Sequence, residues 1–384
     1  MKSGNEQYLV CVLEAEGPDL EEICTRYWAV DEAGAFIETV TAIGKSFGLT
    51  AAKLGRFVKE NSYAYSLDIA CPRCNRPIAF RSRAEFQAEA NRITKECEDC
   101  KLEMVQQKNQ EKERQLRERQ QAAIEECPDV TSFTTEQCIY LLALLKLAAT
   151  EDMMEISELS TIQYGMFTPT KDLDHQALKS LLHSGIIYIS PTSHLTSIEI
   201  TEKGISYYID SVRWRVSLQD KGCGPIYAVL EDEIRQRLSC QGPAILMELC
   251  HEISLHECLA FLDESLSEHR LGYEYGEKTV AVLRAALEQY PVAKVYNFIW
   301  RSARDAAAFY QRKQTSKAHA SRTVVGSIER QCQQALANSW DVKAYKRNFR
   351  MPQSSLSRVV FNTLLGTDDA GFNILIKELF SREG

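Results

Sequence analysis

Two Cys-x-x-Cys pairs, Cys71–Cys74 and Cys97–Cys100, constrain this chain more than any other feature of its sequence. The pairs are separated by 22 residues. A tight turn of this kind can place two thiolates on one metal ion, and two such turns complete a tetrahedron. The separation is close to the range of about 15–20 residues that is typical of four-cysteine zinc sites. Four thiolates leave no open coordination position, so the pattern predicts a structural Zn²⁺ site rather than a catalytic one.

Two other uses of these cysteines remain open at this point. A thioredoxin-like redox site needs a single Cys-x-x-Cys pair, and an iron–sulfur cluster can also be held by four cysteines. The chain has 13 cysteines, mostly at irregular spacings, which favours free thiols in a reducing compartment over a disulfide framework. The segment containing the two pairs resembles a zinc ribbon. A helical insert is expected around 84–94, between the two knuckles.

The length and composition indicate an ordinary globular protein with more than one domain. The chain has 384 residues, with 45% apolar and 26% charged residues, and a single core rarely grows beyond about 250–300 residues. It has no uninterrupted apolar run of 18 residues and no basic, apolar start typical of a signal peptide. We therefore expect a cytoplasmic protein of two or three domains that makes no membrane contact.

The distribution of charge points to an anionic partner, although the net charge of −8 does not. Between Lys294 and Arg358 there are 13 lysines and arginines against three acids, a local net charge of +10. The remaining residues therefore carry −18. Such asymmetry is typical of chains that bind nucleic acid, and it also suits an acidic protein surface.

The stretch before the first cysteine pair predicts two consecutive helices. Apolar residues recur at helical spacing from Phe36 to Phe47, Gly48 suits a helix end, and Thr50 suits the N-cap of the next helix. The residues Ile43–Leu54 resemble the helix-turn-helix of bacterial DNA-binding proteins. That resemblance implies a second helix in the major groove, with Thr50, Ala51, Lys53 and Arg56 directed outward. A helical hairpin that contacts no DNA remains the alternative.

A second module, of a kind found in DNA-binding proteins, is expected over residues 131–218. Helical spacing begins near Thr134 and again near Asp172, and a strand over Ile186–Ser190 is expected to pair with Ser197–Thr201. Helices followed by a hairpin resemble a winged helix, and Ile200–Gly204 resembles the strand-to-helix junction of bacterial winged-helix regulators. Asp172 and Asp174 in the expected recognition helix disfavour phosphate contact.

The C-terminal region, 223–384, is expected to be a basic helical domain. Arg301 to Arg322 interleaves basic residues with Trp300, Phe309 and Tyr310, a pattern that can grip a backbone and stack bases. An aromatic stripe facing the core is an equal alternative. The pair Arg312 and His319 resembles the Arg-x(4–6)-His element of HEPN ribonucleases, which implies an arginine that holds phosphate and a histidine that acts as acid or base. No nucleotide-hydrolysis motif is present.

We therefore expect a mainly α, multidomain protein: helix-turn-helix with zinc ribbon at 1–100, charged connecting helix at 101–130, winged helix (α+β) at 131–218, and helical domain at 223–384. The expected function is binding of nucleic acid, double-stranded DNA first, without catalysis. The protein would serve as a regulator or as the recognition subunit of a larger prokaryotic complex, such as a mobile-element or phage-defence machine. A protein–protein scaffold and a HEPN-like ribonuclease remain alternatives. Candidate nucleic-acid contacts are Lys45, Lys53, Arg56, Arg73, Arg76, Arg81, Arg83, Arg301, Arg304, Arg312, Lys313, Lys317, Arg322, Lys346, Arg347 and Arg350.

Overall fold

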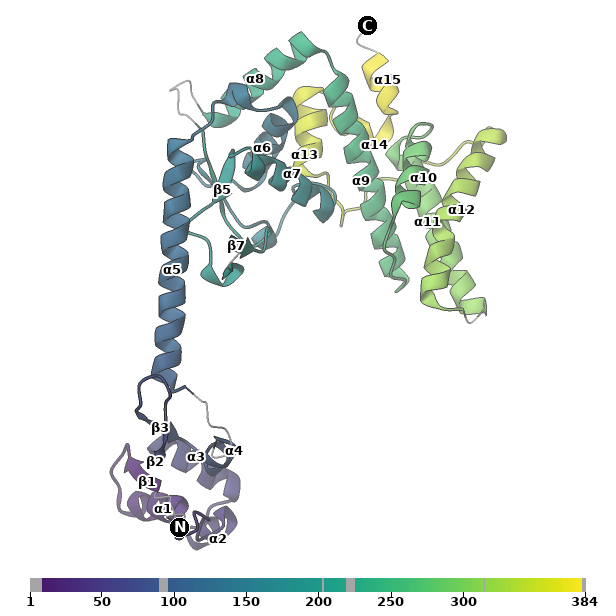
Figure 1. Cartoon of the computed structure of the whole chain (residues 1–384). Coiled ribbons are helices and arrows are strands. Elements are labelled where there is room, and N and C mark those ends of the chain that lie inside the picture. Colours follow the sequence, from purple (N-terminus) through teal and green to yellow (C-terminus); the bar gives the residue numbers. More distant parts are fainter. Residues whose placement is uncertain (1–8, 90–95, 202–203, 219–224, 314, 382–384) are drawn as a thin grey trace, which may run out of the picture. The chain divides into compact units, whose positions relative to one another are not determined.

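The computed structural model describes residues 9–89, 96–201, 204–218, 225–313 and 315–381. The protein is mainly helical with small antiparallel sheets, which confirms the expected mainly α class (Figure 1). The chain divides into two compact units, residues 1–111 and 112–384. Within the described ranges no helix is long and apolar enough to cross a membrane.

The first unit combines a three-stranded antiparallel sheet, in the order β1-β2-β3, with short helices. Its elements are β1 Leu9–Leu13, α1 Pro18–Trp28, α2 Val40–Ser46, α3 Ala51–Asn61, β2 Ser62–Ala70, β3 Pro77–Phe80, α4 Arg83–Glu89 and the start of α5 Glu98–Glu125. Trp28, Ile43, Leu54 and Phe80 are buried in one apolar core that also contains Cys71 and Cys100. The cysteine pairs therefore lie at the edge of a packed core.

Helix α2 begins later than the apolar spacing indicates. The expected helix from Phe36 is wrong at its start, because the Thr39 side chain caps α2 by accepting from the Ala42 N–H at 3.2 Å. Phe36 instead forms an isolated antiparallel bridge with Val30. Thr50 caps α3 as expected, accepting from the Lys53 N–H at 3.3 Å. Only four residues separate α2 from α3, so the connection is tight.

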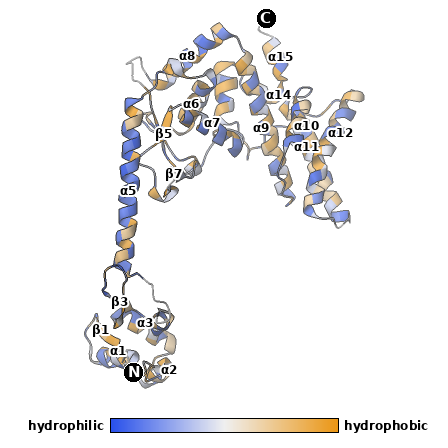
Figure 2. Ribbon diagram, viewed as in Figure 1, coloured by the Kyte–Doolittle hydropathy of each residue, from blue (hydrophilic) through white to orange (hydrophobic). Residues whose placement is uncertain are grey.

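Helix α5 is a long, charged helix of 28 residues. The charged connecting helix was expected over 101–130; α5 begins three residues earlier, at Glu98, and ends at Glu125. Most of its residues are hydrophilic, as the blue ribbon of α5 shows (Figure 2). Ion pairs one turn apart support the helix, such as Arg114–Glu118 at 2.6 Å. Leu116, by contrast, is fully buried in the core of the second unit.

The second unit is built around the buried helices α6 and α9. Its elements are α6 Thr135–Ala148, β4 Glu155–Ile156, α7 Lys171–His183, β5 Ile187–Ile189, β6 Ile198–Thr201, β7 Gly204–Tyr207, β8 Trp214–Val216, α8 Ile226–Gln241, α9 Ala244–Glu268, α10 Glu277–Leu287, α11 Val292–Lys313, α12 Lys317–Ala337, α13 Ser355–Ser357, a π-helical turn Arg358–Leu364, α14 Ala370–Asn373 and α15 Ile376–Ser381. Short 3₁₀ turns lie at Val130–Ser132, Leu159–Thr161 and Leu195–Ser197. One apolar cluster joins α6, α7 and α8 to the first half of α9 and to residues near the C-terminus. The domain limits expected inside this unit stay a prediction.

The strand pairing of the second unit differs from the sequence prediction. Strand β5 pairs with β8, placing Ile189 opposite Trp214, whereas β6 pairs with β7 in a separate two-stranded sheet. The expected pairing of β5 with β6 is therefore wrong. Trp214 and Val216 are both buried, so the distant strand β8 offers β5 more apolar burial than the local partner does. Gly204 begins a strand and no helix, and residues 202–203 of the expected junction lie outside the described ranges.

Candidate functional site

The four cysteines of the two Cys-x-x-Cys pairs come together from three elements of the first unit. Cys71 directly follows β2, and Cys74 lies in the turn that leads to β3. Cys97 immediately precedes α5, and Cys100 lies in its first turn. The turn after Cys71 is closed by the Asn75 N–H, which donates to the Cys71 carbonyl at 2.8 Å, while Asn75 adopts a φ of 57°. Asparagine tolerates this left-handed conformation better than most residues.

The spacing of the four sulfur atoms fits a single tetrahedral ion. All four lie within 4.8 Å of one another, and the Cys74 and Cys97 sulfurs are 3.6 Å apart. Zinc–sulfur bonds of about 2.3 Å in a tetrahedron place the sulfurs about 3.8 Å apart. A disulfide would need about 2.05 Å, and all four cysteines are free. The predicted ligand set is thus brought together in a geometry compatible with a metal site.

Backbone N–H groups turn toward these sulfurs. The Cys97 N–H donates to Sγ of Cys71 at 3.3 Å, and the Cys100 N–H donates to Sγ of Cys97 at 3.5 Å. Hydrogen bonds from backbone N–H groups, that of Cys97 above all, lower the pKa of the Cys71 thiol to about 6 against the effect of burial. Burial, reinforced by the neighbouring sulfurs, raises the pKa of Cys100. Thiolates this close together would repel one another, so the arrangement is compatible with a bound cation.

The predicted basic contacts on α2 and α3 are exposed and available. Lys45, Lys53 and Arg56 are exposed, and none of them has an ion-pair partner among the described residues. Lys59, which the sequence analysis did not select, is exposed on the same helix and likewise has no such partner. Helical spacing could have found it, because positions 56 and 59 lie three apart and share a face.

The basic residues near the first cysteine pair have partners. Arg73 donates to Gln107 at 3.1 Å, and Arg76 lies 3.7 Å from Asp99, both at the surface. Arg81 pairs with Glu14.

Arg83 is an internal residue, so its selection as a nucleic-acid contact is not supported. It is 7% exposed and donates through Nε to the Tyr27 carbonyl at 2.6 Å. Its guanidinium also lies 4.2 Å from the centre of the Phe36 ring. Arg83 thus packs against this part of the core and is held there by hydrogen bonds and ring contacts.

In the second unit, the predicted contacts on α11 and α12 lie at the surface. Arg301, Arg304, Arg312, Lys317 and Arg322 are exposed, whereas the Lys313 side chain lies outside the described residues. Arg304 is 3.0 Å from Asp305 and lies over the Trp300 ring. The chain that carries Tyr345 crosses α11, because the Tyr345 N–H donates to the Ala293 carbonyl at 2.8 Å. Lys346 is exposed, and Arg350 lies 3.3 Å from Glu264.

Arg347 is the second predicted contact that the structure places inside. Its guanidinium lies 3.0 Å from Glu257 and 2.7 Å from Asp369, and its side chain is 17% exposed. It also lies over the Phe372 ring at 4.4 Å. Burial raises the pKa of Glu257, and Arg347 opposes that rise. This arginine is committed to two carboxylates, so we remove it from the candidate interface.

The ribonuclease candidates Arg312 and His319 lie at the end of α11 and in the first turn of α12. Both side chains are exposed, and the His319 ring lies 5.8 Å from that of Phe309. No hydrogen bond joins the two candidates in the described part of the chain. The structure thus offers no acid–base pair here.

The first turn of α7 is occupied by contacts within the unit. The Tyr275 hydroxyl donates to Asp172, and Thr170 Oγ1 lies 2.6 Å from His256 Nδ1. Asp174 accepts from the Thr168 N–H at 2.9 Å, and burial raises its pKa to about 6. Both acids therefore contact neighbouring segments of the unit, an arrangement that the sequence pattern alone does not indicate.

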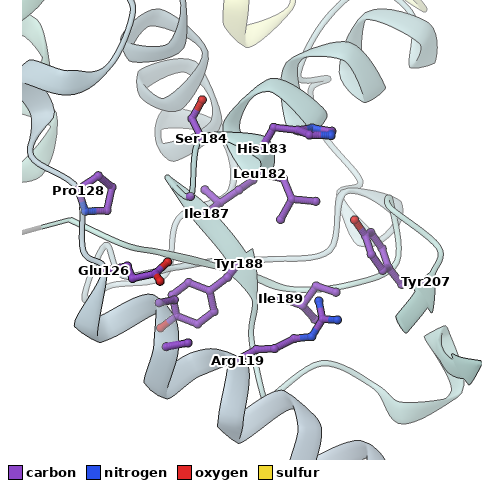
Figure 3. Close-up of a pocket in the computed structure, with 13 residues that line it drawn as sticks. Arg119, Glu126, Pro128, Leu182, His183, Ser184, Ile187, Tyr188, Ile189 and Tyr207 are labelled. Carbon is purple, nitrogen blue, oxygen red and sulfur yellow. The ribbon is translucent and has the colours of Figure 1, made fainter. Parts of the chain in front are cut away.

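A hollow of about 560 Å³ opens beside β5 (Figure 3). Arg119 on α5 and Glu126 just after it contribute opposite charges, and Tyr188 comes from β5. Much of the remaining wall is apolar, with Leu182 and Ile187 among the lining residues. The lining offers no metal-ligand set and no nucleophile paired with a base, so we assign no chemistry to it.

Comparison with known proteins identifies no relative. No protein-family model, no curated protein and no solved structure matches the chain. The functional argument therefore depends on the residues and their geometry.

Proposed function

We propose that this chain is a zinc-containing nucleic-acid-binding protein that binds double-stranded DNA through its first unit. The observation that carries the proposal is the exposed face of α3, where Lys53, Arg56 and Lys59 have no ion-pair partner among the described residues. Unpaired cations on one helix face can neutralise phosphates and release counterions. The protein would act as a regulator or as the recognition subunit of a larger prokaryotic complex, as in mobile-element or phage-defence systems.

The arrangement of α2 and α3 supports a helix-turn-helix role. The Leu49 N–H donates to the Gly44 carbonyl at 2.7 Å, and a Cβ atom at Gly44 would lie 2.6 Å from the Leu49 carbonyl oxygen. Only glycine permits this close approach of the turn to α2. The N-terminus of α3 is exposed beyond its Thr50 cap, as the entry of a recognition helix into the major groove requires.

Zinc is the metal that the four-cysteine site favours. Soft thiolates in a tetrahedron suit Zn²⁺ or iron–sulfur chemistry. A closed set of four ligands makes the proposed role structural, because no position remains for substrate or water. Zinc would tie the β2–β3 turn to the start of α5 and thereby stabilise the unit that presents α3. Metal analysis should find about one zinc per chain, whereas an iron–sulfur protein would contain iron and acid-labile sulfide.

The second unit would supply further contacts. The helices α6 and α7 with the β6–β7 hairpin are proposed as a winged-helix-like module, but its α7 is engaged by Tyr275 and His256 and is not proposed to enter DNA. The exposed Arg301 and Lys346, near the Trp300–Tyr345 ring pair, are proposed to contact the phosphate backbone.

Fluorescence anisotropy with labelled double-stranded DNA tests the proposal. The triple variant K53Q/R56Q/K59Q should bind much more weakly than the wild type. A control variant, K108Q/R235Q/R358Q, removes the same charge from exposed residues outside the proposed interface and should bind within about twofold of the wild type. If the wild type binds no nucleic acid at low salt, the scaffold alternative is favoured. If it shortens RNA, and H319A does not, the ribonuclease alternative replaces the proposal.

A further inference from the structure

A hollow in the second unit is lined by three positively charged side chains. It lies between α12 and the segment around the start of α10 and has a volume of about 470 Å³. Its lining residues are Tyr273, Lys278, Arg322, Thr323, Val325, Gly326 and Arg330. Three of the seven are cationic and none is acidic. In the described ranges, Lys278, Arg322 and Arg330 have no ion pair or side-chain hydrogen bond. The neighbouring acids Glu277 and Glu329 do not line the hollow.

Helix geometry places the two arginines at the ends of one surface strip. Arg322, Gly326 and Arg330 follow each other at intervals of four residues on α12, and therefore lie on one face of that helix. Eight residues of α-helix span about 12 Å. Lys278, at the start of α10, adds a third charge from the opposite wall. The positive charge is therefore spread along a strip about two helical turns long.

Gly326, between the two arginines, keeps this strip open. A Cβ atom added there would have no neighbour within 4 Å, so packing within the described chain does not require glycine. Glycine in a helix interior is about 1 kcal/mol less favourable than alanine. A residue that weakens the helix without a packing reason suits a place where a ligand approaches the backbone closely.

We propose that this hollow binds a chain of adjacent phosphate groups, carried by a nucleotide or by a nucleic-acid strand. Three cations spread along a strip fit a row of several phosphates better than they fit a single compact anion. The Tyr273 ring at the wall can stack on a base, and its hydroxyl lies 2.8 Å from Thr279 Oγ1, which fixes its position. The strand form of this inference rests on the proposed nucleic-acid function, while the nucleotide form does not.

Calorimetric titration of the full chain tests the inference, with ATP, adenosine and a single-stranded oligonucleotide as probes. Two variants address the hollow: R322Q/R330Q removes charge, and G326E introduces an acid into open space without backbone strain. K108Q/R358Q is the control, because it removes two exposed charges outside the lining and outside the candidate nucleic-acid contacts. Loss of charged hydrogen bonds should weaken ATP or strand binding at least about tenfold in both hollow variants, adenosine should not bind, and the control should stay within about twofold.

The outcomes separate this inference from the proposed function. Weaker ATP binding in the hollow variants identifies a nucleotide ligand, and weaker strand binding alone identifies a nucleic-acid backbone. Wild-type affinity of both hollow variants for both phosphate probes would overturn the inference, as would a wild type that binds neither. The α3 variant K53Q/R56Q/K59Q should keep its ATP affinity. Absent duplex binding with intact ATP binding would therefore refute the proposed function alone.

Discussion

The backbone N–H of Cys97 points at Sγ of Cys71 across a distance of 3.3 Å, so the second cysteine pair contacts the first directly. These residues are 26 positions apart in the chain. Cys71 and Cys100 are both buried and belong to the core that contains Leu54 of α3. Disrupting the four-cysteine site would therefore affect α3, the helix that carries the proposed DNA contacts.

Replacing Cys71 should remove the metal and unfold the first unit. Metal binding and folding are coupled in small four-ligand sites, because the ligands are not gathered in the unfolded chain. We expect C71S to contain little zinc and to be cleaved rapidly within residues 9–89 under limited proteolysis. Cys240 is an exposed cysteine outside the centre, so C240S should retain both the metal and the protease resistance. Unchanged metal content in C71S would refute the ligand assignment.

Alanine at Gly44 should destabilise the α2–α3 pair. Its Cβ would lie 2.6 Å from the Leu49 carbonyl oxygen, so the turn must move, at a cost of about 1–3 kcal/mol. Gly55 in α3 is the matched control, because a Cβ there meets nothing within 4 Å, and G55A should gain up to about 1 kcal/mol. Hydrogen exchange of α2 and α3 peptides during urea titration measures both effects. Equal protection of the two variants would show that the turn does not need glycine.

The sequence predicted the helices of the first unit better than its sheet. Caps and apolar spacing are local signals, and they located α3 and its Thr50 cap. Strand β2 was missed because its buried face carries small residues, Ser62, Ala64 and Ser66, while Tyr63 and Tyr65 are only half-buried. An alternation of large and small residues gives a weak apolar signal for a strand.

Breaking the internal ion pairs of Arg347 with Glu257 and Asp369 should lower the free energy of unfolding far more than breaking a surface ion pair. In R347M, Glu257 would remain buried without its cation, which should lower the free energy of unfolding by about 3–5 kcal/mol. R350M removes a pair whose arginine is 60% exposed and should cost at most about 1 kcal/mol. Burial raises the pKa of Glu257, so this carboxyl group carries more negative charge at pH 8 than at pH 5. The loss of unfolding free energy in R347M should therefore be larger at pH 8 than at pH 5. Equal stability of the two variants would contradict the assigned internal role.

Asp174 should make the stability of the second unit depend on pH. Burial raises the pKa of this carboxyl to about 6, above the unfolded value of about 3.9. The folded state therefore binds the proton more tightly, and the stability that it contributes below pH 4 is lost as the pH rises through 6. D174N, which cannot ionise, should gain up to about 2–3 kcal/mol relative to the wild type between pH 4 and 7. If the free energies of unfolding of D174N and the wild type changed in parallel with pH, the assignment of Asp174 as a buried carboxyl with a raised pKa would be wrong.

Charge counting predicted the basic region but could not identify the available cations. Arg83 and Arg347 are surrounded by aromatic rings and carbonyl or carboxylate oxygens that come from distant parts of the chain. Such partners become neighbours only in the folded state, so local sequence cannot reveal them. Lys278 and Arg330 were missed for the same reason, because the hollow that joins them forms between two helices. The cysteine pairs were predictable because each pair is a local turn with fixed ligand chemistry.

The salt dependence of duplex DNA binding tests the central claim most directly. The logarithm of the association constant, measured by anisotropy against the logarithm of salt concentration, falls by about 0.9 for each neutralised phosphate. We predict a steep slope for the wild type and a slope smaller by about 2.7 in K53Q/R56Q/K59Q, since three phosphate contacts are lost. The same slope in both proteins, or no binding by the wild type at low salt, would contradict the assignment of α3 as the DNA-binding helix.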